Sequence, residues 1–329
     1  MSGYYSGPPS KHFDGTRFFI PDHPTDKTLG ELWRWTWNAK WRGGRAEWPA
    51  SFPSPFAGCV PPPHSTGLRV TLIGHASFLI QVAGRNILVD PVYADRASPV
   101  RWAGPQRVNP PGIAFADLPL IDTVLLTHNH YDHLDFSTLR RLWRRFRPRI
   151  IAPLGNDTVI QRRLPDVDVG VLDWGQAADL GHGIIAHLEP SLHWSARGLG
   201  DRRMALWGAF VLSTPAGVVY HVGDTAYGDG RVFRAVRDKY GPPTLAILPI
   251  GAYAPRWLMA NQHMDPQEAV RAFRDCGALQ AIGHHWGTFQ LTDEAIEAPA
   301  ETLAATGVER FHAMRPGEVL EEGKEGLLF

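Results

Sequence analysis

The chain has 329 residues, with 33 basic and 33 acidic side chains and 44% hydrophobic residues. This composition is typical of a globular protein with a large core, and the formal charge of zero argues against a protein that binds nucleic acid by general attraction. We find no signal peptide and no run of about 20 apolar residues that could cross a membrane, which predicts a cytoplasmic protein. Cys59 and Cys276 have neither the spacing of a disulfide framework nor that of a thiolate metal site, so a metal would need His and carboxylate ligands.

Residues 1–66 are expected to form an N-terminal extension that packs on the core. Residues 1–28 are rich in proline, glycine and charge, which is typical of an extended arm, and residues 48–63 form a proline-rich linker. Between them, residues 28–41 predict an amphipathic helix with apolar residues at helical spacing. These apolar residues are Leu29, Leu32, Trp33, Trp37 and Trp41. We expect this helix to pack on the main domain.

A membrane-surface helix is the alternative for residues 28–41. Trp35 falls off the stripe, and basic residues accompany the indoles, a combination found in helices that lie on lipid. These basic residues are Arg34, Lys40, Arg42 and Arg45. This alternative predicts peripheral contact with the inner surface of a membrane.

Residues 67–329 are expected to form the catalytic domain, with the same pattern in two halves. Strands at 78–82 and 86–89 are joined by a Gly turn and end at Asp90, and strands at 208–213 and 218–222 repeat this and lead to Asp224. A Tyr follows each Asp three residues later. We interpret this as a weak internal duplication, in which two sheets pack face to face with helices outside. The clearest helices are predicted at 136–146 and 265–276.

Residues 127–135 carry the strongest chemical signal. Within six residues they place His128, His130, Asp132 and His133 where the apolar run 124–126 passes into the helix at 136. Burial of three imidazoles and a carboxylate together is costly without a cation, so the stretch predicts two neighbouring pairs of metal ligands. In the alternative interpretation, Asp132 caps the helix and the histidines make ordinary hydrogen bonds.

Three further ligand-type residues follow apolar runs later in the chain: His193, Asp224 and His285. Because strand ends meet at one edge of a sheet, we expect these side chains to lie around residues 128–133.

This set of residues resembles the metallo-β-lactamase-fold hydrolases over residues 68–329, and within them the phospholipases D that hydrolyse N-acyl-phosphatidylethanolamine. The shared stretches are HNHYDHLD at 128–135, LWG at 206–208, GDT at 223–225, PIGAY at 249–253, PRW at 255–257 and HWGTF at 285–289. The resemblance implies an α/β fold, an αββα sandwich of two mixed β-sheets flanked by helices, here with an N-terminal helical extension. It also implies a dinuclear metal site at one edge.

By the same resemblance, His128, His130 and His193 would hold one ion, and Asp132, His133 and His285 the other, with Asp224 between them. His284 departs from the family pattern and is kept as the alternative to His285. Ala254 also departs, because the lipid enzymes have an acidic residue there. Nitrogen and oxygen ligands favour two Zn²⁺ ions, with iron and manganese as alternatives.

Other residues are expected around the ions. His75 and Asp90 would orient metal-bound imidazoles. His263 would orient the substrate or protonate a leaving group, or else only cap a loop. Candidates for substrate contacts are Tyr131, Tyr253, Arg256, Trp257 and Gln262, with Arg256 assigned to phosphate.

These expectations predict a phosphodiesterase of phospholipase D type that acts on N-acyl-phosphatidylethanolamine-like phospholipids. Two metal ions would share a water and lower its pKa, so that a metal-bound hydroxide attacks phosphorus, with Asp132 and Asp224 as the catalytic carboxylates. The alternatives are a cytoplasmic lactonase or a sugar-phosphate or ester hydrolase of the same fold, and a metal-binding protein without turnover. The expected partner is a small-molecule or phospholipid substrate and not nucleic acid, and a homodimer is left open.

Overall fold

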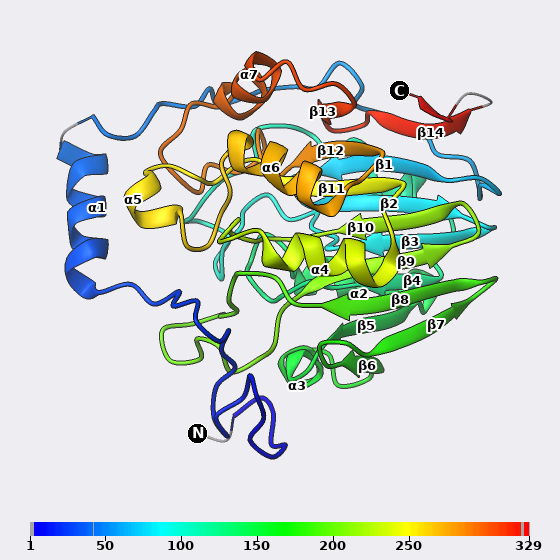
Figure 1. The fold of residues 1–329 in the computed structure, drawn as a ribbon, viewed down its shortest axis with the longest axis horizontal. Coiled ribbons are helices and arrows are strands. Elements are labelled where there is room, and N and C mark those ends of the chain that lie inside the picture. The colour runs from blue at the N-terminus through cyan, green and yellow to red at the C-terminus, as the bar shows by residue number, and fades with distance from the viewer. Residues whose placement is uncertain (1–2, 42, 324–325, 329) are drawn as a thin grey trace.

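The computed structural model describes residues 3–41, 43–323 and 326–328, which form two mixed sheets packed face to face with helices outside (Figure 1). The strands of the eight-stranded sheet lie in the order β15 (Gly326–Leu328), β14 (Val319–Gly323), β1 (Arg69–Gly74), β2 (Ser77–Val82), β3 (Arg85–Val89), β4 (Thr123–Leu125), β5 (Arg149–Pro153) and β6 (Val169–Leu172). Those of the seven-stranded sheet lie in the order β13 (Phe311–Ala313), β12 (Gln280–His284), β11 (Leu245–Pro249), β10 (Gly217–His221), β9 (Ala209–Thr214), β8 (Ile184–Glu189) and β7 (Ala177–Gly181). The predicted αββα sandwich is confirmed.

Each sheet contains an antiparallel hairpin followed by parallel strands. In one sheet β2 and β3 form the hairpin, and β4, β5 and β6 continue parallel to β3. In the other, β9 and β10 form the hairpin, and β11, β12 and β13 continue parallel to β10. The strand pairing therefore repeats as the duplicated sequence pattern predicts.

The central strands of each sheet are buried on both faces because helices cover the outside of the sheets. Along β2, Phe78, Ile80 and Val82 pack between the sheets, whereas Leu79 points to the helix side. Such alternation is the normal geometry of a strand. Helices α2 (Phe136–Phe146) and α3 (Asn156–Gln161) cover the eight-stranded sheet. Helices α4 (Arg231–Tyr240), α6 (Pro266–Cys276) and α7 (Ala298–Ala305) cover the seven-stranded sheet.

Two helices begin where the sequence predicts. Asp135 caps α2 by accepting a hydrogen bond from the Ser137 amide, and Asp265 forms a capping box with Glu268 at the start of α6. Side-chain caps of this kind satisfy amides that have no partner within the helix. Because Asp135 is the cap of α2, Asp132 is left for another purpose.

The N-terminal arm is part of the core rather than a loose extension. Phe13 and Phe18 lie in the cluster between the sheets and are almost completely buried, with their ring centroids 4.6 Å apart. The arm leads to α1 (Leu29–Trp41), which stands at the side of the sandwich (Figure 1). Within the described residues, no helix is both long and apolar enough to cross a membrane.

Helix α1 contacts the main domain, but not through its apolar stripe. Trp33, Trp37 and Trp41 are 65%, 45% and 64% exposed. The helix is attached through its other side, where Trp35 Nε1 donates a hydrogen bond to Asp293 Oδ2 at 2.7 Å. Helical periodicity identified the stripe but not the face that the rest of the chain covers.

Substitution Phe13→Ala should lower the free energy of unfolding by about 3–5 kcal/mol, because it leaves a cavity in the core. Phe56→Ala is the matched control, since Phe56 is 46% exposed. It should change stability by less than about 0.5 kcal/mol. Urea unfolding measures both, and equal midpoints for the two variants would show that the arm is not part of the cooperative core.

Candidate metal centre

Four strand ends bring His and Asp side chains to one edge of the sandwich. His128, His130, Asp132 and His133 follow β4, while His193, Asp224 and His285 follow β8, β10 and β12. All seven are buried except His130, which is partly buried. The sequence therefore predicted correctly which strand ends meet.

The loop after β4 is held close to the loop after β10. Asp90 accepts hydrogen bonds from the amide and the hydroxyl of Thr127 at 2.7 and 2.6 Å. Gly223, with φ of 65°, lies so near that a Cβ there would come within 2.9 Å of the Thr127 side chain. Only glycine fits this approach easily. The contact places Asp224 beside the histidines of residues 128–133.

One cluster consists of His128, His130, His193 and Asp224, whose nearest side-chain nitrogen and oxygen atoms all lie within 4.8 Å of one another. His193 Nε2 is 3.5 Å from Asp224 Oδ2 and 3.2 Å from His130 Nδ1. His128 Nε2 is 3.8 Å from the same Asp224 oxygen. Three imidazoles and a carboxylate at these distances can surround one divalent cation.

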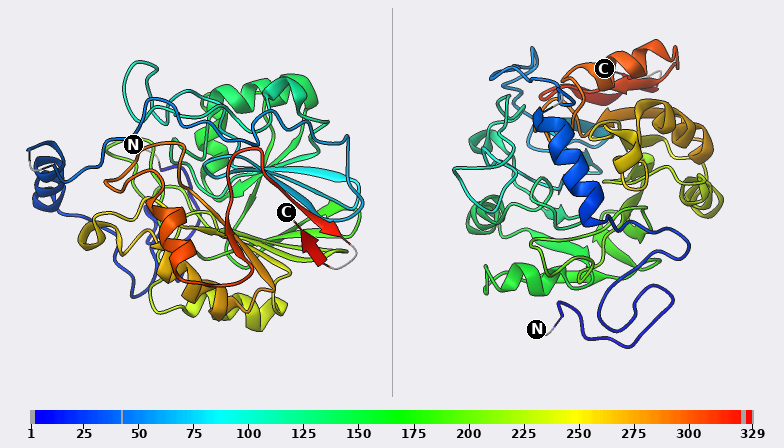
Figure 2. Two further views of the ribbon diagram at one scale, coloured as in Figure 1. Left: turned by 90° about the horizontal axis from the view of Figure 1, so that it is seen from above. Right: turned by 90° about the vertical axis from the view of Figure 1, so that its left-hand side faces the viewer.

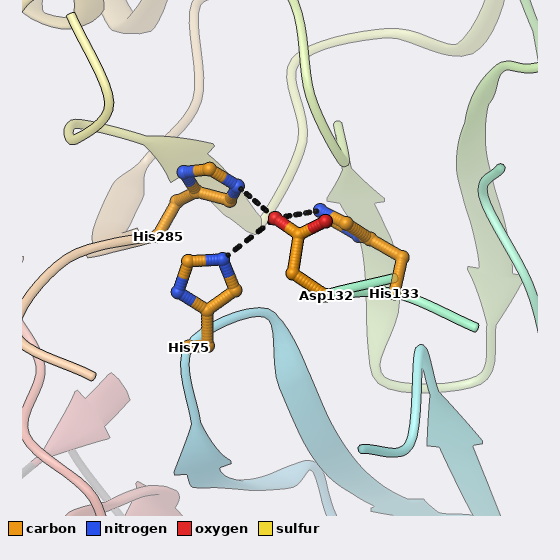
Figure 3. A group of neighbouring side chains, drawn as sticks. All are labelled: His75, Asp132, His133 and His285. Carbon is orange, nitrogen blue, oxygen red and sulfur yellow. Dashed lines mark hydrogen bonds and ion pairs between the residues drawn. The ribbon is translucent and has the colours of Figure 1, made fainter. Parts of the chain in front are cut away.

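A second cluster consists of His75, Asp132, His133 and His285 (Figure 3). The Oδ2 atom of Asp132 lies 3.0 Å from His75 Nε2, 3.3 Å from His285 Nε2 and 3.6 Å from His133 Nε2. Asp224 reaches this cluster too, with Oδ1 3.1 Å from His285 Nε2 and Oδ2 3.3 Å from His133 Nε2. Asp224 thus lies between the two clusters, as the resemblance implied.

Apart from the ion-pair contacts given above, several of these atoms make no hydrogen bond within the described part of the chain. They are Nε2 of His130, of His133 and of His285, and Oδ1 of Asp224. Buried polar atoms are rarely left unpaired, because each costs the free energy of desolvation. Since the atoms converge and are of the types that zinc and iron prefer, the residues fit a pair of divalent cations.

The pKa values in the first cluster leave its imidazoles neutral. Burial lowers the pKa of His193 to about 3, that of His130 to about 4, and that of His128 well below its ordinary value. Burial alone would raise the pKa of Asp224, but the neighbouring His285 and His133 hold it well below its usual range. Neutral imidazoles and an ionised carboxylate are the protonation states that metal binding requires.

Two histidines of the second cluster behave in the opposite way. Burial opposes a charge on His285, but the carboxylates of Asp224 and Asp132 outweigh it and raise its pKa to about 9. The same carboxylates, with Asp90, raise the pKa of His133 well above its ordinary value despite burial. In the metal-free protein, these two imidazolium groups supply the positive charge that the carboxylates need.

Hydrogen bonds to the outer ring nitrogens fix the orientation of several imidazoles. His133 Nδ1 lies 2.7 Å from Asp90 Oδ2, and His193 Nδ1 lies 3.0 Å from the backbone oxygen of Gln262. Such contacts turn the other ring nitrogen towards a metal. Asp90 therefore lies where the sequence predicted. His75 was expected to orient an imidazole, but its hydrogen bond goes to the Asp132 carboxylate.

His284 lies outside both clusters. Its ring faces Phe78 and His221 at centroid distances of 5.6 and 5.5 Å, and its two ring nitrogens are buried. His285, with φ of 68°, turns to the opposite side and enters the second cluster. The structure thus places His285, and not its neighbour, beside Asp132 and Asp224.

His263 joins the centre, whereas Gln262 supports it from outside. The His263 ring lies 5.0 Å from that of His193 and 5.4 Å from that of His285, and burial lowers its pKa to about 3. The Gln262 side chain accepts a hydrogen bond from Trp194 Nε1 at 2.9 Å. Trp194 in turn packs edge-on against His130 at 4.4 Å. No pattern in the sequence pointed to Trp194, because an indole that follows a metal ligand has no characteristic spacing.

Arg256, which the sequence assigned to substrate phosphate, is engaged with other residues of the chain. Its guanidinium donates to Glu268 Oε2 at 2.6 Å and to the backbone oxygen of His263 at 2.9 Å, and its Nε lies 3.4 Å from Asp265. These partners occupy the guanidinium, so Arg256 instead ties the start of α6 to the segment that carries His263.

The other predicted contact residues lie around the centre rather than in it. The Tyr131 hydroxyl donates to the backbone oxygen of Arg197 at 2.8 Å, and the Arg197 guanidinium carbon lies 3.7 Å from the centre of the Tyr131 ring. Both residues line a cavity of about 440 Å³. Tyr253 is partly buried. Trp257, on α5 (Arg256–Met259), faces α1, with the Arg34 guanidinium 4.6 Å above its ring.

Comparison with known proteins places the chain among metal-dependent hydrolases. Residues 85–286 match the family described as beta-lactamase superfamily domain. The chain is 36% identical over 248 residues to N-acyl-phosphatidylethanolamine-hydrolyzing phospholipase D 1 of Caenorhabditis elegans, which covers 72% of this chain and 69% of that protein. It is 32% identical over 238 residues to the mitochondrial enzyme of that name from Saccharomyces cerevisiae, covering 71% and 50%. It is 27% identical over 256 residues to a metal-dependent hydrolase of Pyrobaculum aerophilum, covering 77% and 100%.

Solved structures share the fold at low sequence identity. Igni18, a metallo hydrolase from Ignicoccus hospitalis, aligns with a TM-score of 0.57 at 20% identity over 77% of this chain and 97% of its own. CmlA, a diiron beta-hydroxylase from Streptomyces venezuelae, aligns with a TM-score of 0.59 at 21% identity over 78% of this chain and 54% of its own.

The affinity of the metal-free protein for a divalent cation should increase as the pH rises from 6.5 towards 9. The lower limit is the ordinary pKa of histidine, and the upper limit is the raised pKa of His285, about 9. At neutral pH His285 and His133 carry protons, and these must leave before the nitrogens can bind a cation. Calorimetric titration with Zn²⁺ in two buffers of different ionisation enthalpy would count the released protons. An affinity that does not change over this pH range would contradict the protonation states described above.

Substitution Arg256→Ala should lower the urea midpoint, because it removes the hydrogen bonds to Glu268 and to the His263 backbone, but it should leave KM for a phosphodiester unchanged. Arg256→Lys keeps the charge and loses the paired hydrogen bonds, so it should be intermediate in stability. Steady-state kinetics and urea unfolding of both variants separate the two effects. A large rise in KM with unchanged stability would instead indicate that Arg256 contacts the substrate phosphate.

Proposed function

Because the chain belongs to the beta-lactamase superfamily of metal-dependent hydrolases, we propose that it is a phosphodiesterase of phospholipase D type acting on N-acyl-phosphatidylethanolamine-like phospholipids. The observation that carries this proposal is the pair of His and Asp clusters that share Asp224. Two relatives, at 36% and 32% identity, carry the name of that activity. The alignment covers 69% and 50% of these relatives, so we assign their substrate to this chain only as a proposal.

In this proposal, His128, His130 and His193 hold one cation and Asp132, His133 and His285 hold the other, with Asp224 shared. Two divalent cations, such as Zn²⁺ or iron, would supply Lewis acidity and lower the pKa of a bound water. The chain itself fixes the geometry: Asp90 orients His133, the Gln262 backbone orients His193, and His75 holds one oxygen of Asp132. No side chain is needed as a covalent nucleophile.

His263 is the residue best placed to contact the substrate at the centre. It forms a third group of close side chains with Asp224 and His285, and its Nδ1 has no hydrogen-bond partner within the described residues. Since burial holds its pKa near 3, the imidazole is neutral at physiological pH. A neutral imidazole can donate a hydrogen bond to a phosphate oxygen but is a poor source of a proton. We therefore assign His263 to orienting the substrate rather than to protonating the leaving group.

The cavity beside Tyr131 is a candidate site for a part of the substrate that lies away from the metal ions, since none of the seven assigned ligands lines it. It lies against the loop that carries the first ligands, and its wall combines aromatic, cationic and acidic side chains: Tyr93, Tyr131, Phe136, Arg101, Arg197, Asp95 and Asp135. Such a wall suits a group with both apolar and charged parts. The cytoplasmic location expected from the sequence stays a prediction, and the yeast relative is named mitochondrial.

The protein should hold about two divalent ions per chain and cleave N-acyl-phosphatidylethanolamine in detergent micelles. Asp132→Ala should lower kcat/KM by about a thousandfold or more, because loss of a ligand removes several kcal/mol of transition-state stabilisation. Leu279→Ala is the matched control, since Leu279 is 58% exposed and precedes β12 at the other end of the strand from His285. Elemental analysis and product quantification provide the two measurements.

The same assay should include a chromogenic phosphodiester, simple lactones and sugar phosphates. Faster turnover of a lactone or a sugar phosphate than of the lipid would replace the proposed substrate and keep the metal centre. Equal rates for Asp132→Ala and the parent on every substrate would show that the metal centre does not catalyse hydrolysis.

A further inference from the structure

Trp33, Trp37 and Trp41 form a continuous exposed surface along α1, which we call the Trp stripe. The residues are four positions apart, so they lie on one face of the helix. Their ring centroids are 5.4 Å apart between Trp33 and Trp37, and 6.0 Å apart between Trp37 and Trp41. Leu32, which is 39% exposed, widens the stripe. Large apolar side chains gathered in this way on a protein surface usually mark an interaction site.

The other side of α1 is fastened, so the Trp stripe has a fixed direction. Besides the hydrogen bond from Trp35 to Asp293, the Arg34 guanidinium lies over the Trp257 ring. Thr28 and Glu31 cap the first turn of the helix through reciprocal hydrogen bonds. Beyond the helix, Arg45 donates to the backbone oxygen of Gln290 at 2.8 Å. These contacts hold α1 in a fixed orientation, with the indoles of the Trp stripe exposed to solvent.

The Trp stripe lies on the same side of the molecule as the metal centre. Trp257, under Arg34, belongs to α5, and the chain continues from α5 directly to Gln262 and His263 beside the metal ligands. Figures 1 and 2 show α1 standing across the end of the sandwich at which α5 lies. By contrast, the basic helix α2 covers the outer face of the eight-stranded sheet.

The size of the Trp stripe does not suit a dimer interface. From their exposed fractions, the three indoles present together on the order of 400 Å². A stable dimer buries about 800 Å² on each partner. A bilayer sets no such minimum, because a protruding helix can sink its indoles into the interface while the rest of the protein remains in water.

The chemistry of the Trp stripe also favours lipid. Trp is enriched where hydrocarbon meets water, because its ring is apolar and its N–H is a donor. Trp is also common in protein–protein interfaces, so the small area of the stripe decides between the two.

We propose that the Trp stripe docks the protein on the surface of a phospholipid bilayer, so that the metal centre faces the lipid. This inference rests on the proposed function in one respect, since a phospholipid substrate gives the docking its purpose. Its contacts, however, are independent of turnover: they belong to α1 and to none of the residues assigned to the metal ions or to the substrate.

Binding is tested by co-sedimentation with vesicles of phosphatidylcholine and phosphatidylglycerol, which contain no N-acylated lipid. The full-length parent should sediment with the vesicles, and the variant Trp33→Ala/Trp37→Ala/Trp41→Ala should bind at least about a hundredfold more weakly. The control variant Leu120→Ala/Leu279→Ala removes exposed apolar side chains that precede β4 and β12, at the ends of those strands away from the metal centre, and should bind like the parent. If the triple variant has a lowered urea midpoint, Trp33→Gln/Trp41→Gln replaces it and should still lose about tenfold in binding.

Three results would overturn the docking proposal: a parent that does not sediment with the vesicles, a triple variant that sediments like the parent, or a dimer in sedimentation velocity without lipid that the Trp substitutions dissociate. The last result would assign the stripe to a second copy of the chain. Hydrolysis in detergent micelles should be the same for the triple variant and the parent. If the parent binds vesicles but cleaves no phospholipid in micelles, the proposed function fails and the docking surface stands.

Discussion

Two buried carboxylates, Asp132 and Asp224, are the constraint on which the rest of the structure depends. A carboxylate removed from water is costly unless opposite charge and hydrogen bonds compensate it. The chain surrounds this pair with His75, His133 and His285, and two of these imidazoles have raised pKa values because of it. The same nitrogens and oxygens are the ones that a divalent cation would bind. In this protein, therefore, protons and metal ions compete for one set of contacts, and the charge of the carboxylates keeps that set together in either state.

The duplicated hairpin explains how so many ligands reach one place. Asp90 and Asp224 leave the second strand of equivalent hairpins, β2–β3 and β9–β10. Asp224, after β10, lies between the two clusters, whereas Asp90, after β3, holds His133 and Thr127 in position. Parallel strands after each hairpin then deliver loops to the same edge. One pattern thus provides both a shared ligand and the support for its neighbours.

The sequence predicted the parts that follow from local pattern. Apolar runs separated by turns predicted the strands, the duplicated pattern predicted two sheets, and helical spacing predicted α2 and α6. Ligand-type residues after apolar runs, together with the family resemblance, predicted the seven residues that converge. What it could not give are pairings between side chains. Arg256 lies 12 residues before Glu268, and only the approach of α5 to α6 brings them together. The contact of His75 with Asp132 depends on a turn in which His75 has φ of 55°.

The N-terminal region shows why a match over the catalytic core leaves the substrate open. The family match covers residues 85–286, yet Phe13 and Phe18 fill the space between the sheets, and α1 stands on the metal-centre side. These segments precede the first ligand-bearing loop and contribute none of the residues assigned to the metal ions. They do supply contacts next to the centre, because Arg34 of α1 lies over Trp257 of α5, and α5 leads to Gln262, whose backbone oxygen holds His193. If the proposed function holds, chains with the same metal ligands can therefore differ in these contacts, which lie outside the ligand set.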